Sequence, residues 1–207
     1  NRTAVRRHRD RAATNLSAHN FLFSESAERL VDRLDDVTRS FPLALDLGCH
    51  GGDLARILGD RGGIEMLVQS DLSPALAALA NVKGAPALAG DEEILPFAKM
   101  SFDLILSNLS LHWVNDLPGV LVQVRRALKP DGLFLAAALG GDTLHELRTS
   151  LFQAETEIEG GVSPRFSPLI DVRGLGNLMT RAGFSMPVVD SETVTVSYGE
   201  PLKLFLD

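Results

Sequence analysis

The chain has 207 residues, of which 45% are hydrophobic and 23% are charged. This composition is typical of one folded domain with a substantial core, and it excludes wholesale disorder. No apolar run approaches the roughly 18 residues of a membrane-spanning helix, so no membrane span is expected. Cys49 is the only cysteine, which excludes an internal disulfide and suits a reducing compartment.

The net charge of −7 is unevenly distributed along the chain. Residues 1–11 carry five arginines against Asp10, a local charge of +4, which leaves −11 for the remainder. An acidic body argues against general nucleic-acid binding. The arginine-rich start fits a solvated helix, a remnant of an organelle-targeting sequence, or a lid over an anionic group. Because Asn1 is not an initiator methionine, we expect a trimmed N-terminus.

Apolar residues recur at helical spacing over residues 24–40, and Phe41-Pro42 ends that predicted helix. Short apolar strands then alternate with helices. The five expected strands are Leu43–Leu47, Ile64–Asp71, Ala85–Ala89, Phe102–Asn108 and Leu133–Leu139. The expected helices between them are Asp53–Asp60, one from Ser73-Pro74 onward and one from Asp116 onward. Such alternation predicts an α/β fold with a parallel, doubly wound sheet.

The C-terminal third begins with Gly140-Gly141, after which a helix is expected. Thr143 and Glu146 have the spacing of a capping box at its start. A second helix is expected over residues 169–182, and the alternation of Glu192–Tyr198 predicts a strand. Residues 201–207 indicate the start of a further helix.

Polar residues follow the predicted strands at the positions where ligands bind in doubly wound sheets. Asp46 and a glycine-rich turn lie at the end of the first strand, and Asp71 ends the second. The third strand is followed by Asp91 and Glu92, and the fourth ends in Ser107 and Asn108. Taken singly, Asp71 is explained by helix-start chemistry and Asp91 by a solvated loop. Together, the set predicts a site for a nucleoside cofactor rather than plain α/β structure.

The turn follows a G-x-G-x-G spacing in which Gly48 and Gly52 hold the outer places and His50 the middle one. It lacks the final glycine of the dinucleotide pattern G-x-G-x-x-G. Asp46 precedes Gly48 by two residues, and an acid there suits an ammonium group better than a phosphate. Asp71 lies 19 residues beyond Gly52, a spacing that suits the ribose hydroxyls. The pattern therefore favours S-adenosylmethionine over NAD.

Several segments resemble class I S-adenosylmethionine-dependent methyltransferases over residues 43–139, namely "LDLGC", "SDLSPALAALA", "GDEEILPF", "SFDLILSNLSLHWVNDLP" and "ALKPDGLF". Downstream, "GGDTLHELR", "AETEIEGGVSP", "FSPLIDVRGLGNLMTRAGF" and "VTVSYGEPLKLF" resemble methyltransferase-like assembly factors of respiratory complex I and their bacterial relatives. The biotin-pathway O-methyltransferases share "LSLHW" more distantly. The resemblance implies a Rossmann-like, mostly parallel seven-stranded sheet with helices on both faces. It implies an N-terminal helical or lid segment (1–41), a cofactor-binding domain (42–207) and a missing C-terminal piece.

The resemblance also assigns roles to individual positions. The methionine end of S-adenosylmethionine is expected at Asp46, Gly48 and Gly52, the ribose at Asp71, and the adenine near Leu72, Asp91 and Glu92, with Ser107 as a further cofactor contact. His50 departs from the family's glycine and either crowds the methionine moiety or turns aside. We expect weakened but surviving binding. Arg7, Arg9 and Arg11 are candidates to fold over the cofactor carboxylate.

His112 and Trp113 follow the fourth strand on the side expected for a methyl acceptor. His112 is a candidate base and Trp113 a candidate aromatic wall for a cation; the alternatives are a capping histidine and a core tryptophan. Asp142, Thr143 and Arg148 are further candidates for substrate contact.

The resulting hypothesis is a methyltransferase that acts on an unidentified acceptor, with a complex I subunit as the candidate partner. The alternatives are a non-methylating assembly scaffold and, by resemblance, arginine hydroxylation of a partner subunit. His8-Arg9-Asp10 formally matches two ligands of a non-haem iron triad, but the motif lies in an arginine run, so no metal site is expected. A bacterial cytoplasm is the expected location, with the mitochondrial matrix as the alternative.

Overall fold

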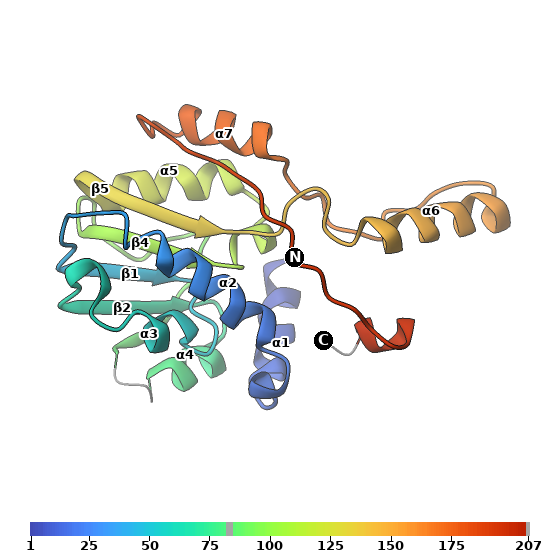
Figure 1. Cartoon of the computed structure of the whole chain (residues 1–207), viewed down its shortest axis with the longest axis horizontal. Helices are drawn as coiled ribbons and strands as arrows, with labels where there is room; N and C mark the ends of the chain where they lie inside the picture. Colours follow the sequence, from blue (N-terminus) through green and yellow to red (C-terminus); the bar gives the residue numbers. More distant parts are fainter. Residues whose placement is uncertain (82–84, 206–207) are drawn as a thin grey trace.

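The computed structural model describes residues 1–81 and 85–205 and contains a parallel β-sheet flanked by helices (Figure 1). The strand order is β3-β2-β1-β4-β5, and every neighbouring pair is parallel. The strands are β1 (Leu43–Leu47), β2 (Met66–Asp71), β3 (Ala87–Ala89), β4 (Phe102–Asn108) and β5 (Leu128–Ala137). The expected α/β class is confirmed, but the described residues form five strands rather than seven.

Seven α-helices are present among the described residues. They are α1 (Arg2–Ala12), α2 (Phe21–Asp32), α3 (Asp53–Ile57), α4 (Pro74–Asn81), α5 (Leu117–Ala127), α6 (His145–Glu159) and α7 (Val172–Arg181). Short 3₁₀ turns lie at η1 (Leu16–Ala18), η2 (Arg61–Gly63), η3 (Leu111–Trp113) and η4 (Pro201–Phe205). None of the helices in the described part of the chain is long and apolar enough to cross a bilayer.

Alternating residues of the central strands supply two hydrophobic cores, one on each face of the sheet. On one face, Leu104 and Leu106 of β4 pack with apolar residues of α2 and α3. On the other, Leu45 of β1 and Ile105 of β4 pack with α5. This arrangement follows from the period of two along a strand, which sends successive side chains to opposite faces. Both faces are thereby covered, as a parallel sheet requires.

The switch in strand order, where the chain changes the direction in which it adds strands to the sheet, lies between β1 and β4. The chain runs outward from β1 to β2 and β3, and then returns to place β4 on the other side of β1. In such sheets the carboxyl ends of the two strands that flank the reversal form a crevice where ligands bind. The residues that follow β1, β2 and β4 therefore meet at one edge of the molecule.

Several boundaries differ from the sequence expectations. The helix expected over residues 24–40 ends at Asp32, because Leu34 and Asp35 bond three residues back, to Val31 and Asp32, in tight turns. The helix expected to reach Asp60 stops at Ile57. The last strand begins earlier than expected, at Leu128, because pairing with β4 starts there and shifts register before it continues.

The predicted Thr143–Glu146 capping box is wrong. Leu144 occupies the N-cap position of α6 with φ +54°, and no side chain caps the helix there. Thr143 instead donates its backbone N–H to the Gly140 carbonyl at 3.0 Å, within the turn that precedes α6. In Figure 1, α6 extends away from the sheet.

The predicted strand Glu192–Tyr198 is also wrong, because the segment does not pair with any strand among the described residues. It runs back past α2, where Arg29 pairs with Glu192 at 3.0 Å and Arg33 pairs with Asp190 at 2.9 Å. Exposed ion pairs, rather than a ladder of backbone hydrogen bonds, connect this part of the chain to α2. The helix expected over residues 201–207 is the 3₁₀ turn η4; residues 206–207 lie outside the described part.

Substitution Leu106→Ala tests the core under α2 and α3. Leu106 is fully buried in the central strand, so its truncation should lower the free energy of unfolding by about 2–5 kcal/mol. Urea unfolding followed by circular dichroism measures the change. Ile94→Ala is the control, because Ile94 is largely exposed and its truncation should cost less than about 0.5 kcal/mol. Equal losses in both variants would contradict this account of the core.

Candidate functional site

The glycine-rich turn connects β1 to α3 and lies against the end of β2. The backbone N–H groups of Gly48 and Cys49 both donate to the Ser70 carbonyl, at 2.7 and 3.0 Å. Gly48 and Gly52 have φ values of +78° and +77°, a conformation that favours glycine. The turn is therefore held sharply folded at the carboxyl edge of the sheet.

Asp71 connects this turn to the next one. One of its carboxylate oxygens accepts the backbone N–H of His50 at 3.0 Å, and the other accepts that of Ser73 at 2.8 Å. Ser73 in turn caps α4, since its hydroxyl accepts the Leu76 N–H at 3.1 Å. Asp71 and Ser73 thus have the helix-start role that the sequence offered as the alternative explanation of Asp71. The same carboxylate also accepts a hydrogen bond from Arg9 Nη1 at 3.2 Å.

His50 has φ +48°, the left-handed conformation in which glycine is the least strained residue. Its imidazole Nε2–H donates to the Asn108 carbonyl at 3.1 Å, and its ring lies 4.4 Å from the ring of Phe23. Burial lowers the pKa of His50, which keeps the ring neutral. The side chain is therefore turned toward β4 and α2 while its backbone N–H faces Asp71.

Asp46 is buried near the end of β1, and neither of its carboxylate oxygens has a hydrogen-bond partner. Burial, together with the nearby carboxylates Asp71 and Asp53, raises the pKa of Asp46 well above its ordinary value. Buried polar atoms are nearly always paired, so this buried, unpaired carboxyl group at a strand end is suited to accept from a donor or a cation. Asp46 is the expected ammonium-binding residue.

Glu92 and Asp91 follow β3 and meet two arginines from α1. Glu92 is buried and accepts from Arg9 Nη1 at 2.6 Å, from the Ser110 hydroxyl at 2.8 Å and from Arg2. Asp91 accepts from Arg2 Nη2 at 2.7 Å. Although burial opposes it, the charges of Arg9 and Arg2 lower the pKa of Glu92, which is therefore ionised.

Ser107, another expected cofactor contact, has a structural partner. The Ser107 hydroxyl donates to the Leu47 carbonyl at 2.7 Å and thus links β4 to β1 inside the sheet. Leu72 is half-buried between Asp71 and the start of α4. The amide of Asn108 donates to the Phe23 carbonyl at 2.8 Å and ties β4 to α2.

His112 and Trp113 form the η3 turn after β4, with ring centroids 5.3 Å apart. Trp113 is 48% exposed, so the alternative of a core tryptophan is wrong. Burial, with smaller contributions from His50 and Arg9, lowers the pKa of His112 to about 4, and its Nδ1 atom has no hydrogen-bond partner. At neutral pH the ring is uncharged and is a weak base.

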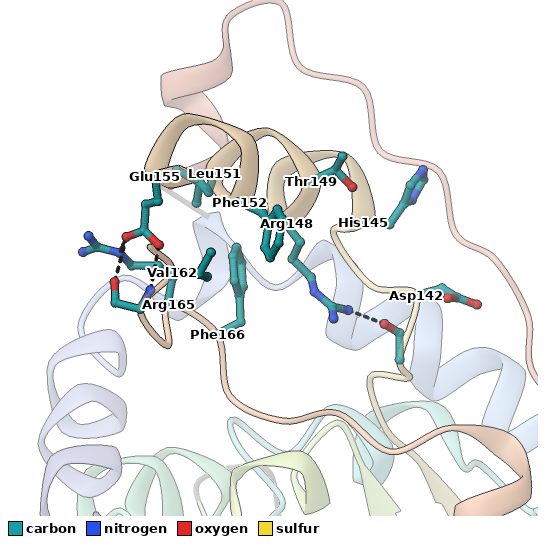
Figure 2. A pocket seen from close by; sticks show the side chains of 12 residues that line it. Asp142, His145, Arg148, Thr149, Leu151, Phe152, Glu155, Val162, Arg165 and Phe166 are labelled. Carbon is teal, nitrogen blue, oxygen red and sulfur yellow. Dashed lines mark hydrogen bonds and ion pairs between the residues drawn. The ribbon is translucent and has the colours of Figure 1, made fainter. Parts of the chain in front are cut away.

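Asp142 and Arg148 lie apart from these groups, in a groove of about 540 Å³ between α6 and residues 162–166 (Figure 2). Arg148 turns back to donate to the Gly141 carbonyl, and Arg165 pairs with Glu155 at 2.5 Å. None of the strand-end residues lines this groove. The structure therefore does not bring Asp142 and Arg148 together with the strand-end carboxylates.

Sequence reasoning missed Arg2 and Ser110, and it did not foresee the pairing of Arg9 with Asp71 and Glu92. No local signal marks them, because each contacts residues about 90–100 positions away. Arg7 and Arg11 are exposed, and Asp10 accepts the Ser73 hydroxyl at 2.5 Å. Within residues 1–81 and 85–205, no group of three His, Cys, Asp or Glu side chains is placed to share a metal ion.

Asp46→Asn tests whether the buried carboxyl group is unpaired. An acid whose pKa is raised on folding destabilises the folded state as pH rises above the unfolded value. The variant should therefore be more stable than the parent by about 1 kcal/mol or more at pH 7, with the difference shrinking toward pH 4. Thermal unfolding across this range measures it, with the exposed Asp36→Asn as control. A less stable Asp46→Asn protein would show that the carboxylate has a stabilising partner.

The His112 ring should titrate near pH 4. Because the pKa of His112 in the folded protein lies below the ordinary histidine value of 6.5, the unfolded chain takes up the proton first. Stability should therefore decrease as pH falls from about 6.5 toward 4. NMR of the imidazole carbon-bound protons measures the titration, and His112→Asn identifies the signal. Half-protonation at pH 6 or above would place the ring in a wetter environment than the one described.

Comparisons with known proteins identify the family of the chain. A family model described as a methyltransferase domain matches residues 45–136. The chain is 45% identical over 210 residues to a Danio rerio protein named arginine-hydroxylase NDUFAF5, mitochondrial, with all of this chain and 65% of that protein covered. It is 34% identical to a malonyl-[acyl-carrier protein] O-methyltransferase of Methylovorus sp. (strain MP688), with 98% of this chain and 70% of that protein covered.

Among solved structures, a chain from the complex of the Haloferax volcanii Trm112 methyltransferase activator with a methyltransferase has a TM-score of 0.70. It is 22% identical, and the match covers 86% of this chain and 75% of that one, which establishes the shared fold. The chain spans about half to two thirds of the length of the proteins named arginine-hydroxylase. The family match indicates S-adenosylmethionine as the cofactor. The chain belongs to the class I S-adenosylmethionine-dependent methyltransferase family.

Proposed function

We propose that this chain binds S-adenosylmethionine at the carboxyl edge of its sheet and transfers the methyl group to an acceptor, with a respiratory complex I subunit as the candidate partner. The observation that carries the proposal is the unpaired, buried Asp46 carboxyl group beside a glycine turn of positive φ. Asp71 and Glu92 extend the same acidic edge across the ends of the neighbouring strands.

The residues present fit the cofactor in chemical type. Asp46 is an acceptor without a donor, which suits the ammonium group of the methionine moiety. Asp71 is a buried acceptor at a strand end, which suits the ribose hydroxyls, and Asp91 with Glu92 would meet the adenine edge. When bound, the cofactor supplies a methyl group activated by a sulfonium. Gly48 and Gly52, both at positive φ, would hold the turn beside it in its sharp fold.

The acceptor would lie on the side of His112 and Trp113. A ring with a pKa of about 4 removes a proton inefficiently near neutrality, so His112 suits a role as hydrogen-bond acceptor that orients the nucleophile. The half-exposed Trp113 would provide a flat wall beside it. Alignment of nucleophile and methyl group, rather than strong base catalysis, would then be the contribution of these two residues.

A second candidate function rests on the relatives named arginine-hydroxylase, which are up to 46% identical to the chain. By that likeness, the chain would modify an arginine of a partner subunit or assist assembly without methylation. The same names favour the mitochondrial matrix as a location, whereas the bacterial O-methyltransferase relatives favour a bacterial cytoplasm. The division into a lid segment (1–41) and a cofactor-binding domain (42–207) remains a prediction.

Calorimetric titration with S-adenosylhomocysteine tests the cofactor site. The parent protein should bind it, and Asp46→Asn should bind at least about tenfold more weakly, since the ammonium loses its counter-charge. Asp46 is preferred to Asp71 for this test because it does not contact Arg9. Asp36→Asn and titration with NADH are the controls. An unchanged affinity in Asp46→Asn would remove Asp46 from the site.

Mass spectrometry of purified complex I subunits, incubated with the protein and S-adenosylmethionine, tests the reaction. Methyl transfer predicts a gain of one CH₂ on the acceptor and an equal amount of S-adenosylhomocysteine. A gain of one oxygen atom would support the hydroxylation alternative instead. A stable complex with neither mass change would support an assembly scaffold.

A further inference from the structure

The helix α1 contains a buried arginine although most of its surface is polar and exposed. Arg9 is only 7% exposed. Its guanidinium donates to Asp71 at 3.2 Å, to Glu92 at 2.6 Å and to the Ser110 hydroxyl at 2.9 Å. A buried charge of this kind persists only when it is paired and hydrogen-bonded on several sides. The helix is therefore anchored to the site and does not merely lie over it.

The partners of Arg9 are the groups proposed above to hold the cofactor. A carboxylate offers about four lone-pair positions. In Asp71, backbone N–H groups of His50 and Ser73 occupy two, and Arg9 takes a third. Two ribose hydroxyls therefore cannot both reach Asp71 while Arg9 remains there. Arg2 occupies Asp91 and Glu92 in the same way, on the adenine side.

Independent contacts show that the space before the glycine turn is also filled. A Cβ atom added at Gly48 would meet the Ser110 hydroxyl at 2.1 Å, and one added at Gly51 would meet Leu16 Cδ2 at 2.5 Å. Leu16 belongs to η1, which directly follows α1. The N-terminal segment thus closes the site by packing at Gly51 as well as by ion pairs at Asp71.

We propose that α1 is an intramolecular competitor of the cofactor, in which Arg9 takes the place of the ribose at Asp71 and must leave before the cofactor binds. The proposal rests on the cofactor site proposed above. The apparent affinity for the cofactor is then the intrinsic affinity reduced by the fraction of molecules in which α1 is released. Removing the Arg9 charge should raise that fraction.

The affinity test compares calorimetric titrations of S-adenosylhomocysteine into the parent, Arg9→Met and Arg6→Met. Methionine keeps an unbranched apolar stem but cannot pair with Asp71, so Arg9→Met should bind about tenfold tighter or more. Arg6 is an exposed residue of the same helix, and its variant should match the parent. Weaker binding by Arg9→Met would mean that Arg9 contacts the cofactor directly and would overturn the proposal. Equal affinities in all three proteins would also overturn it, while leaving the cofactor site intact.

Hydrogen exchange on the unmodified protein provides a second test that does not depend on a variant folding. Saturation with S-adenosylhomocysteine should increase amide exchange over residues 2–12, because α1 is released. Decreased exchange would show a lid that closes on the cofactor and would overturn the proposal. If neither the parent nor folded Arg9→Met binds S-adenosylhomocysteine, the cofactor site itself fails, and the competitor proposal fails with it.

Discussion

The site depends on the carboxylate of Asp71, which is fully buried yet joined to three segments of the chain. It accepts N–H groups from the turn after β1 and the turn after β2, and it pairs with the guanidinium of Arg9. The sheet register makes this possible, because Leu47 lies opposite Ser70 and the two turns therefore emerge side by side. A buried ion needs most of its hydrogen-bonding capacity satisfied, so the three segments are fixed relative to one another.

The acidic edge of the sheet is neutralised only in part. Arg2 and Arg9 come from a segment of residues 1–11 with a local charge of +4, and they hold Glu92 in its ionised form. Asp46 has no such partner, and its pKa moves in the opposite direction because burial and neighbouring carboxylates favour its protonated form. The pKa values of Glu92 and Asp46 thus shift in opposite directions because Glu92 is paired with arginines of α1 and Asp46 is not.

The strands that form the centre of the sheet were predictable, because β1 and β4 are short apolar runs whose residues are buried on both faces. The start of α5 was also predictable, since Asp116 caps it through its own side chain. Glu192–Tyr198 shows what the sequence does not reveal. Alternation of polar and apolar residues predicts an extended segment, but a β-strand also requires the edge of a neighbouring strand to pair with. Arg9 and Asp71 are 62 positions apart in the sequence. The local sequence pattern shows that each residue is charged, but it does not show that the two pair.

Asp71 is paired and Asp46 is not, and this difference bears on whether the site holds the cofactor or its own N-terminal helix. Both the guanidinium of Arg9 and a ribose present donors to Asp71, so acceptor chemistry at that residue does not separate them. Arg9 reaches Asp71, Glu92 and Ser110, whereas Asp46 is left without a donor. A ligand that brings an ammonium to Asp46 and hydroxyls to Asp71 satisfies a buried carboxyl group that Arg9 leaves unpaired. Because an unpaired buried acceptor is costly, the balance between the closed and the cofactor-bound forms depends on Asp46.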